Sequence, residues 1–219
     1  MRVKIKDIAY YLPERIVTNE DLHKEYPDWD MNLIEKRVGV LQRHIARDDE
    51  TALDLAFHAC TKLFSQEKDL QKQIDGIIFC TQSEDYIMPP NGCILHKMLG
   101  LPDDVFVFDF NLACSGYIYG LALAQGLICS RLTKNILLVN SDTYSKYINK
   151  QDRSVRALFS DGAAVSWVAP SDTNQGIIDI QCSTSGEGYD KFIIPAGGCR
   201  VPRTTKTDIL ETDESGNSR

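Results

Sequence analysis

The sequence is poor in the groups that bind metal ions, phosphates or nucleic acids. Its four histidines, His23, His44, His58 and His96, form neither an H-x-x-x-H nor an H-E-x-x-H pattern, so no metal site is expected. The glycine-rich loops G-x-G-x-x-G and G-x-x-x-x-G-K, which cradle nucleotide phosphates, do not occur. The formal net charge is −7 and no clean basic cluster is present, which argues against nucleic acid as a partner.

The cysteines follow no disulfide or redox pattern. There are seven, an odd number, without a C-x-x-C motif, and most of them lie in apolar runs. We therefore expect reduced, buried thiols in a cytoplasmic protein rather than a disulfide framework. The N-terminal residues MRVKIKDIAY lack the apolar core of a signal peptide, which favours the same localisation.

One long stretch carries no charge. It lies between Asp109 and Arg131, in the sequence DFNLACSGYIYGLALAQGLICSR, and is long enough to suggest a membrane span. It contains Asn111, Ser115, Gln125 and several glycines, and a strand pattern precedes it, so a core helix is the better interpretation. A chain of 219 residues with 43% hydrophobic and 25% charged residues is typical of a globular protein without a membrane partner.

Apolar periodicity predicts strands that alternate with helices. The expected strands cover residues 3–11, 74–81, 105–110, 135–140, 163–168 and 176–183. One expected helix begins after a cap at Thr18. The other expected helices cover residues 29–38, 51–64, 93–99 and the long segment after Cys114. Nearly all-apolar strands separated by helices predict an α/β fold whose mixed sheet is covered on both faces.

Cys114 lies at a predicted strand-to-helix junction. The backbone N–H groups and the dipole of a helix N-terminus stabilise a thiolate, and the same N–H groups can bind the oxyanion of a thioester under attack. Ser115 and Gly116 keep the surroundings small, so a substrate carbonyl can approach. The alternative is one more buried apolar side chain, which is also our expectation for four other cysteines inside predicted elements. These are Cys60, Cys80, Cys93 and Cys129.

The segment FDFNLACSGYIYGLALA resembles the nucleophile region of β-ketoacyl-ACP synthase III, a condensing enzyme of the thiolase fold. Further segments agree in the same order and at matching spacing over about residues 3 to 200. They are YYLPERIVTNEDL, KRVGVLQRHIA, DETALDLA, TQSEDYIMPPNGCILHKMLG, NILLVNSDT and QDRSVRALFSDGAAV. A lone A-C-S-G would be weak evidence, but the ordered series is specific.

The resemblance implies a thiolase-like layered fold, a homodimer, and a nucleophile at the N-terminus of a buried central helix. By this resemblance Cys114 takes an acyl group from acyl-CoA or acyl-ACP, and malonyl-ACP then decarboxylates so that its carbanion attacks the thioester. Acyl carrier protein is thus an expected partner, no cofactor is implied, and the context is fatty acid or related acyl-chain synthesis. Arg37 and Arg153 match basic residues at the CoA-binding mouth; the alternative for each is a solvated surface arginine.

Two positions depart from the family pattern. Leu33 stands where the family has a tryptophan that stacks on the CoA adenine, and Trp29 lies a turn away. This leaves acyl-CoA, acyl-ACP and other thioesters open as the acyl donor. Met88 stands where the family often has a phenylalanine that reaches into the partner's acyl pocket. Because methionine is longer and more flexible, Met88 predicts an acyl group larger than acetyl.

Family members are longer, and their second half supplies a catalytic histidine and asparagine that stabilise the carbanion. None of the four histidines here aligns with the catalytic one. We therefore expect residues 1–185 to form the N-terminal half that carries the nucleophile, and residues 186–219 to be an irregular segment leading toward an absent second half, without which condensation does not proceed.

Two alternatives remain for the function. One is a non-catalytic or split-subunit partner of a condensing-enzyme dimer, although such partners tend to lose the nucleophile. The other is a related acyl-CoA enzyme of the same fold, such as a hydroxymethylglutaryl-CoA synthase or a thiolase. The A-C-S-G-Y context and the D-G-A-A turn that begins at Asp161 fit the synthase III pattern better.

Overall fold

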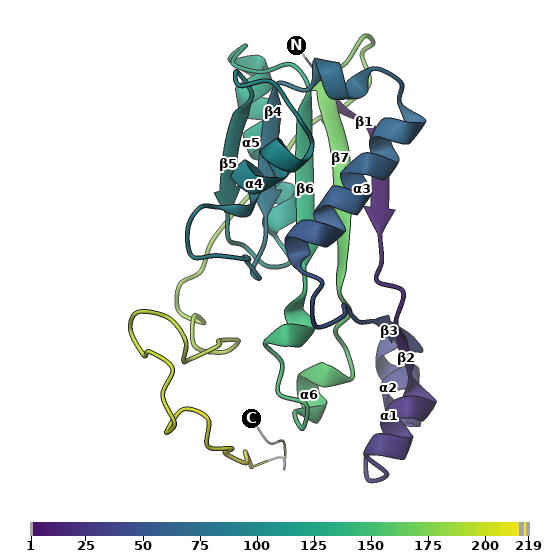
Figure 1. Cartoon of the computed structure of the whole chain (residues 1–219), viewed down its shortest axis with the longest axis vertical. Coiled ribbons are helices and arrows are strands. Elements are labelled where there is room, and N and C mark those ends of the chain that lie inside the picture. The colour runs from purple at the N-terminus through teal and green to yellow at the C-terminus, as the bar shows by residue number, and fades with distance from the viewer. Residues whose placement is uncertain (1, 215–216, 218–219) are drawn as a thin grey trace.

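A five-stranded mixed sheet carries the fold (Figure 1). The computed structural model describes residues 2–214 and 217. The strand order is β1-β7-β6-β4-β5, with β4 parallel to β5 and β6, and β7 antiparallel to β1 and β6. The strands are β1 (Val3–Tyr11), β4 (Gly76–Cys80), β5 (Phe106–Phe110), β6 (Ile136–Asp142) and β7 (Gly162–Pro170). These five confirm the predicted strands, apart from residues 176–183.

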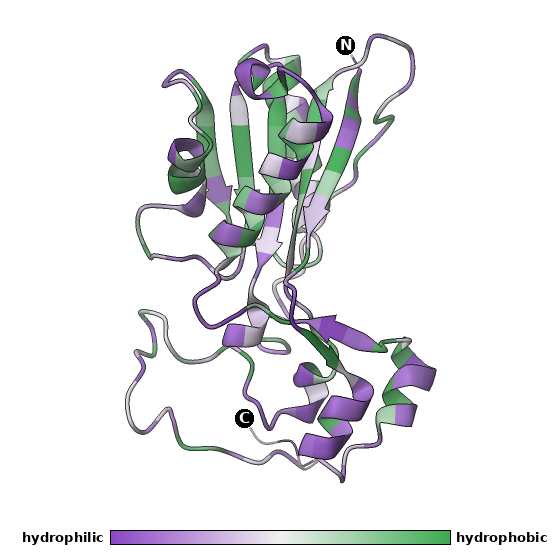
Figure 2. Cartoon of the chain, turned by 45° about the vertical axis from the view of Figure 1, so that its right-hand side comes forward, coloured by the Kyte–Doolittle hydropathy of each residue, from purple (hydrophilic) through white to green (hydrophobic). Residues whose placement is uncertain are grey.

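Helices cover both faces of the sheet, as the apolar strands require (Figures 1 and 2). On one face, α3 (Ala52–Gln66) and α4 (Asn91–Met98) pack in a cluster with Ile77 and Phe79 of β4. On the other face, α5 (Gly116–Cys129) packs in a cluster with Ile78 and Leu138. Alternate residues of β4 thus enter opposite layers, which explains why every residue of this strand is buried. A 3-10 turn, η1 (Leu70–Gln73), connects α3 to β4.

The carboxyl ends of β1, β4, β5 and β6 point toward a smaller basal part, formed by residues 12–50 and 143–161 (Figure 1). It contains the ribbon β2 (Ile16–Thr18) and β3 (Gln42–His44), the helices α1 (Asn19–Glu25), α2 (Met31–Val38) and α6 (Arg153–Arg156), and the turn η2 (Tyr144–Lys146). Its small core groups Leu22, Trp29, Met31 and Ala157. The ribbon was not predicted, because its strands of three residues each are too short for an alternating pattern to appear.

Local chemistry sets the helix ends. Thr18 and Thr51 form capping boxes with Asp21 and Asp54, in which each threonine oxygen accepts from a backbone N–H and each aspartate accepts in return. Gly39 ends α2 at φ +76°, a conformation that favours glycine. These caps explain why the helix starts at residues 19 and 52 follow so closely from the sequence.

The prediction of a strand at residues 176–183 is wrong. The part of this segment near β1 makes a main-chain bond from the Ile177 N–H to the Val3 carbonyl (2.8 Å), but residues 176–183 form no strand. Ile177 and Ile180 nevertheless pack against the α5 side of the sheet, which accounts for the apolar pattern. Within residues 171–214, no helix and no strand longer than a single bridge is present.

Two expectations about burial also change. Only Cys60 and Cys80 are buried; the other five cysteines are exposed, and the described chain contains no disulfide. Helix α5 is buried on the side that faces the sheet, whereas Ile118 and Leu123 on its other side are 45% and 40% exposed. In the part of the chain that the structure describes, no helix has the length and apolar character to cross a membrane.

Candidate functional site

Cys114 lies in the turn between β5 and α5, at the basal edge of the sheet. Its side chain is exposed, in contrast to Cys80 at the end of the neighbouring strand β4. The turn is tight, since the Gly116 N–H donates to the Ala113 carbonyl at 2.8 Å and the Tyr119 N–H donates to the Ser115 carbonyl at 3.1 Å. The exposed thiol thus lies directly before the N-cap, Ser115, of a 14-residue helix.

Cys80 and Gly116 fit together directly behind this turn. The Cys80 thiol donates to the Leu112 carbonyl, with the sulfur 3.2 Å from the oxygen. A Cβ atom at Gly116 would lie only 2.4 Å from the Cys80 sulfur, so only glycine allows the first turn of α5 to approach β4 this closely. Our expectation that Cys80 is buried is confirmed.

Asp142 ties together the ends of β6 and β4. Its Oδ1 accepts hydrogen bonds from the Gln82 N–H at 2.7 Å, the Ser83 hydroxyl at 3.0 Å and the Thr81 hydroxyl at 3.1 Å. Burial raises the pKa of this carboxyl group, while the three hydrogen bonds act in the opposite direction. Sequence reasoning missed this residue; the signal was a single carboxylate at the end of the apolar run NILLVNSD.

A cavity of about 270 Å³ opens where the carboxyl ends of β4, β5 and β6 meet. Such an edge of a parallel sheet is a common place for a ligand. The lining residues come from the three loops after these strands and from the C-terminal segment. They are Gln82, Asn111, Tyr144, Phe192, Ile193 and Ile194. Asn111 precedes Cys114 by three positions, so the cavity lies on the same loop as the thiol.

An aromatic cluster joins the C-terminal segment to this edge of the sheet. The Tyr144 ring lies 5.0 Å from the Phe159 ring and 6.3 Å from the Phe192 ring, measured between centroids. The rings of Phe159 and Phe192 are stacked at 6.1 Å. The apolar wall of the cavity is therefore completed by a segment that is distant in sequence and has no secondary structure of its own.

Arg37 and Arg153 both belong to the basal part. Arg37 is exposed in the last turn of α2, and Arg153 is exposed at the first position of α6. The structure brings their helices into one region, because Met31 of α2 packs with Ala157, the C-cap of α6. Met88 lies apart from them in the loop between β4 and α4, where its side chain is 80% exposed.

Trp29 presents no exposed aromatic face. Its indole is only 9% exposed and stacks on Tyr26, with ring centroids 4.2 Å apart and planes 12° from parallel. Arg156 lies over the other partner of this stack, 5.3 Å from the Tyr26 ring, so both aromatic side chains are committed to the basal core. Leu33, at 40% exposure, is an aliphatic side chain without a stacking face.

The histidines make structural contacts. Ring nitrogens of His44 and His96 lie 2.6 Å from the Pro13 carbonyl and 2.8 Å from the Pro102 carbonyl. The His58 ring packs on the ring of Tyr11 at 4.7 Å. Within the described residues, no group of three or more histidine, cysteine, aspartate or glutamate side chains has the arrangement of a metal site.

The sequence is similar to known acyl-chain condensing enzymes. A sequence model of the family described as 3-oxoacyl-[acyl-carrier-protein (ACP)] synthase III matches residues 108–186, a range that holds Cys114 and Arg153. The β-ketoacyl-[acyl-carrier-protein] synthase III of Fusobacterium nucleatum is 35% identical over 205 residues, and the Campylobacter curvus protein of the same name is 38% identical over 209 residues. Each alignment covers 94% of this chain.

The solved structures agree. A crystal structure of a 3-oxoacyl-(acyl-carrier-protein) synthase III superimposes on the whole chain with a TM-score of 0.95 and 41% identity. The chain is similar to the β-ketoacyl-ACP synthase III family over nearly its whole length. The resemblance stated from the motifs and the thiolase-like α/β fold are thereby confirmed.

The chain spans about three fifths of the length of the synthase III relatives it matches. It covers 62% of the Fusobacterium nucleatum protein, 61% of the Campylobacter curvus protein and 65% of the crystal structure with the TM-score of 0.95. A synthase III structure from Pseudomonas aeruginosa, at TM-score 0.80 and 28% identity, is likewise covered to 63%.

Proposed function

We propose that this chain carries the acyl-loading centre of a β-ketoacyl-ACP synthase III, with Cys114 as the nucleophile. The observation that supports this most directly is the exposed thiol at the N-terminus of α5, on the loop that also lines the cavity at the ends of β4, β5 and β6. The Cys114 thiolate attacks the carbonyl carbon of an acyl thioester, and an oxyanion forms. Collapse of this intermediate expels the thiolate of the donor and leaves an acyl-cysteine.

We propose that condensation uses groups other than His44, His58 and His96, which are engaged in the contacts described above. The proposed reaction of the complete centre adds malonyl-ACP, whose decarboxylation yields the carbanion that attacks the acyl-cysteine. We assign acyl loading to this chain's residues, and condensation to the complete centre in which a histidine and an asparagine are also supplied. The proposed division of the chain remains residues 1–185 for the nucleophile-bearing half and 186–219 for an irregular segment.

Arg37 and Arg153 are proposed to bind the phosphates of the acyl donor. Both are exposed, and arginine forks match phosphate oxygens. The aliphatic Leu33 and the buried Trp29 offer no exposed indole for stacking on an adenine ring. We therefore propose that an acyl group carried on acyl carrier protein is loaded at least as well as one carried on CoA, in a cytoplasmic pathway of fatty acid or related acyl-chain synthesis.

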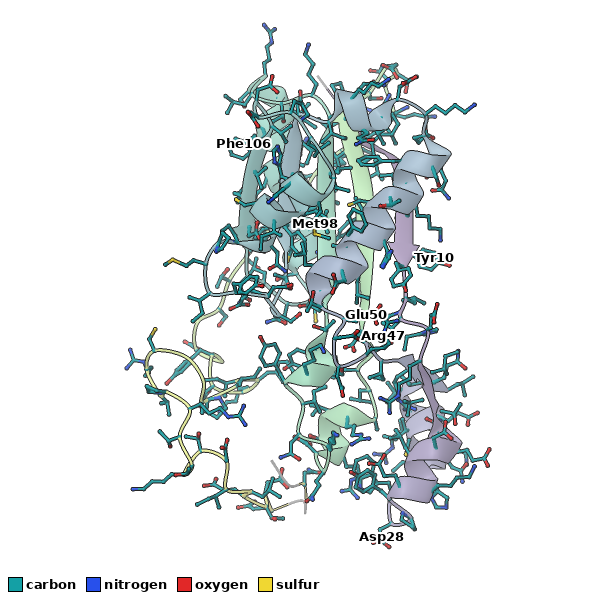
Figure 3. The ribbon with its side chains drawn as sticks, viewed as in Figure 1. Tyr10, Asp28, Arg47, Glu50, Met98 and Phe106 are labelled. Carbon is teal, nitrogen blue, oxygen red and sulfur yellow. The ribbon has the colours of Figure 1, made fainter. Side chains whose placement is uncertain are left out.

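A homodimer is proposed to complete the site. The edge strand β5 is paired on one side by β4, and Phe106, labelled in Figure 3, is 41% exposed on it. The loop tip at Ile87 and Met88 is 97% and 80% exposed, which is unusual for apolar side chains and fits a contact with a partner. Light scattering should give the mass of a dimer for the wild type and of a monomer for Phe106→Lys, since a charge on an edge strand opposes pairing. A monomeric wild type would contradict this assembly.

Intact-mass spectrometry after incubation with acyl donors tests the nucleophile. Acyl-CoA and acyl-ACP of increasing chain length are offered to the wild type, to Cys114→Ala and to Cys129→Ala, the matched control at an exposed cysteine at the far end of α5. We expect one added acyl mass in the wild type and in Cys129→Ala, and none in Cys114→Ala. An adduct that survives in Cys114→Ala would contradict the assignment. Loading that falls steeply beyond two carbons would contradict the role proposed for Met88.

A further inference from the structure

A second thiol lies behind the turn that carries Cys114. Cys80 is the last residue of β4, is only 3% exposed, and is paired in register with Phe110, the last residue of β5. From Phe110 the chain reaches Leu112 in two residues and Cys114 in four, so the end of β4 lies beside the start of the turn. The Thr81 N–H extends this contact by donating to the Phe110 carbonyl at 3.3 Å.

The Cys80 sulfur touches both sides of the turn. On one side its thiol donates to the Leu112 carbonyl at 3.2 Å. On the other side it occupies the space that a side chain at position 116 would need, since a Cβ there would lie 2.4 Å away. Leu112 and Gly116 each stand two positions from Cys114. One buried atom therefore fixes the backbone before and after the exposed thiol.

The two thiols have different chemistry. Burial raises the pKa of Cys80, so its sulfur stays protonated and can act as a donor. A buried, protonated thiol is a poor nucleophile, whereas the exposed Cys114 lies at a helix N-terminus. Cys80 is thus suited to hold the turn and unsuited to react.

We propose that Cys80 is a positioning residue for Cys114, which acts through its packing against Gly116 and its hydrogen bond to the Leu112 carbonyl. The inference rests on the proposed function in one respect, that Cys114 is the reacting thiol. Since S–H···O bonds are weak, the packing contact supplies most of the effect. The sulfur at position 80 and the missing side chain at position 116 then form a complementary pair.

This complementarity can be tested by removing the sulfur at position 80 and adding a methyl group at position 116, separately and together. Cys80→Ala removes the sulfur, Gly116→Ala forces a methyl group against it, and the double variant places the methyl group in the space that the sulfur has left. In the double variant the new Cβ lies 3.8 Å from the Cβ of residue 80 and 3.5 Å from the Cβ of Leu112, which are ordinary contacts. Cys60→Ala is the matched control, because it removes an equally buried sulfur from α3, on the opposite face of the sheet.

The readout is the rate of Cys114 alkylation by iodoacetamide as a function of pH, resolved by peptide mass spectrometry, with urea unfolding recorded in parallel. Each single variant should lower the rate at pH 7 by about tenfold, because the backbone on the two sides of Cys114 is no longer fixed at Leu112 and Gly116. The double variant should return to within about threefold of wild type. Cys60→Ala should lose stability and keep the wild-type profile.

Two results would overturn the proposal. One is a wild-type rate–pH profile in Cys80→Ala, with stability alone reduced, which would make Cys80 a packing residue without influence on Cys114. The other is a double variant that is more impaired than either single variant, which would contradict the complementary fit. If Gly116→Ala does not fold, Cys80→Ala and the double variant still decide. A chain that alkylates as expected but accepts no acyl group would contradict the proposed function and leave the role of Cys80 intact.

Discussion

The closeness of α5 to the sheet makes a quantitative prediction for Gly120. A Cβ atom at this position would lie 2.5 Å from Cδ1 and 3.2 Å from Cδ2 of Leu138, a fully buried side chain of β6. Gly126 lies on the same helix with nothing within 4 Å of such an atom. The helix therefore offers two Gly→Ala substitutions that differ in their surroundings and share the same backbone geometry.

The expected difference follows from two opposing effects. Both substitutions gain about 0.5–1 kcal/mol, because alanine is a better helix former than glycine. Gly120→Ala also overpacks a buried site, which costs about 1–3 kcal/mol. The helix-propensity gain cancels in the comparison, so Gly120→Ala should be less stable than Gly126→Ala by about 1–3 kcal/mol.

Urea unfolding followed by circular dichroism measures this difference. Leu138→Val shortens the side chain that the new methyl group meets, so the double variant with Gly120→Ala should be more stable than the sum of the single effects by about 0.5–1 kcal/mol. Gly126→Ala combined with Leu138→Val should show no such coupling. Equal stability of Gly120→Ala and Gly126→Ala would refute the argument that α5 and β6 are in close contact at this point.

Two further predictions concern polar groups. Burial raises the pKa of Asp142, so the folded chain favours the protonated carboxyl group and loses stability as the pH rises from about 3.9 through the raised value. Asp142→Asn keeps the Oδ1 acceptor but does not titrate, so the variant does not lose stability in this way. The free energy of unfolding of the variant minus that of the wild type should therefore increase with pH over this range. A difference that does not change with pH would contradict the raised pKa. Thr51→Ala should cost about 1–2 kcal/mol in urea unfolding, because the Thr51 oxygen caps α3 and its hydroxyl also donates to Asp85 at 2.8 Å. Thr51→Ser should keep most of this stability, and an equal loss in both variants would contradict the capping role.

Much of the sheet was predictable because its strands are short apolar runs between clear helix signals. The cap at Thr18 located the start of α1, apolar spacing located α3, and the five strands of the sheet were located to within about two residues. The strand expected at residues 176–183 failed because Ile177 and Ile180 bury their side chains against the sheet while their backbone finds almost no ladder partner. Apolar pattern reports side-chain burial, and it does not report whether a neighbouring strand is present.

The residues of the candidate site also differ in whether they could be predicted from the sequence. Cys114 could be found from the sequence, because a strand-to-helix junction is local and its small residues are adjacent to the thiol. Cys80 could not, since it lies inside an apolar strand, 34 positions before Cys114, and only the parallel register of β4 with β5 brings its sulfur to the turn. Gly116 could be recognised as a small residue from the sequence. The reason that it must be small is its contact with the Cys80 sulfur, which only the three-dimensional structure shows. A reacting side chain can be recognised from its own segment, whereas the groups that hold it in place belong to whichever strands the fold sets beside it.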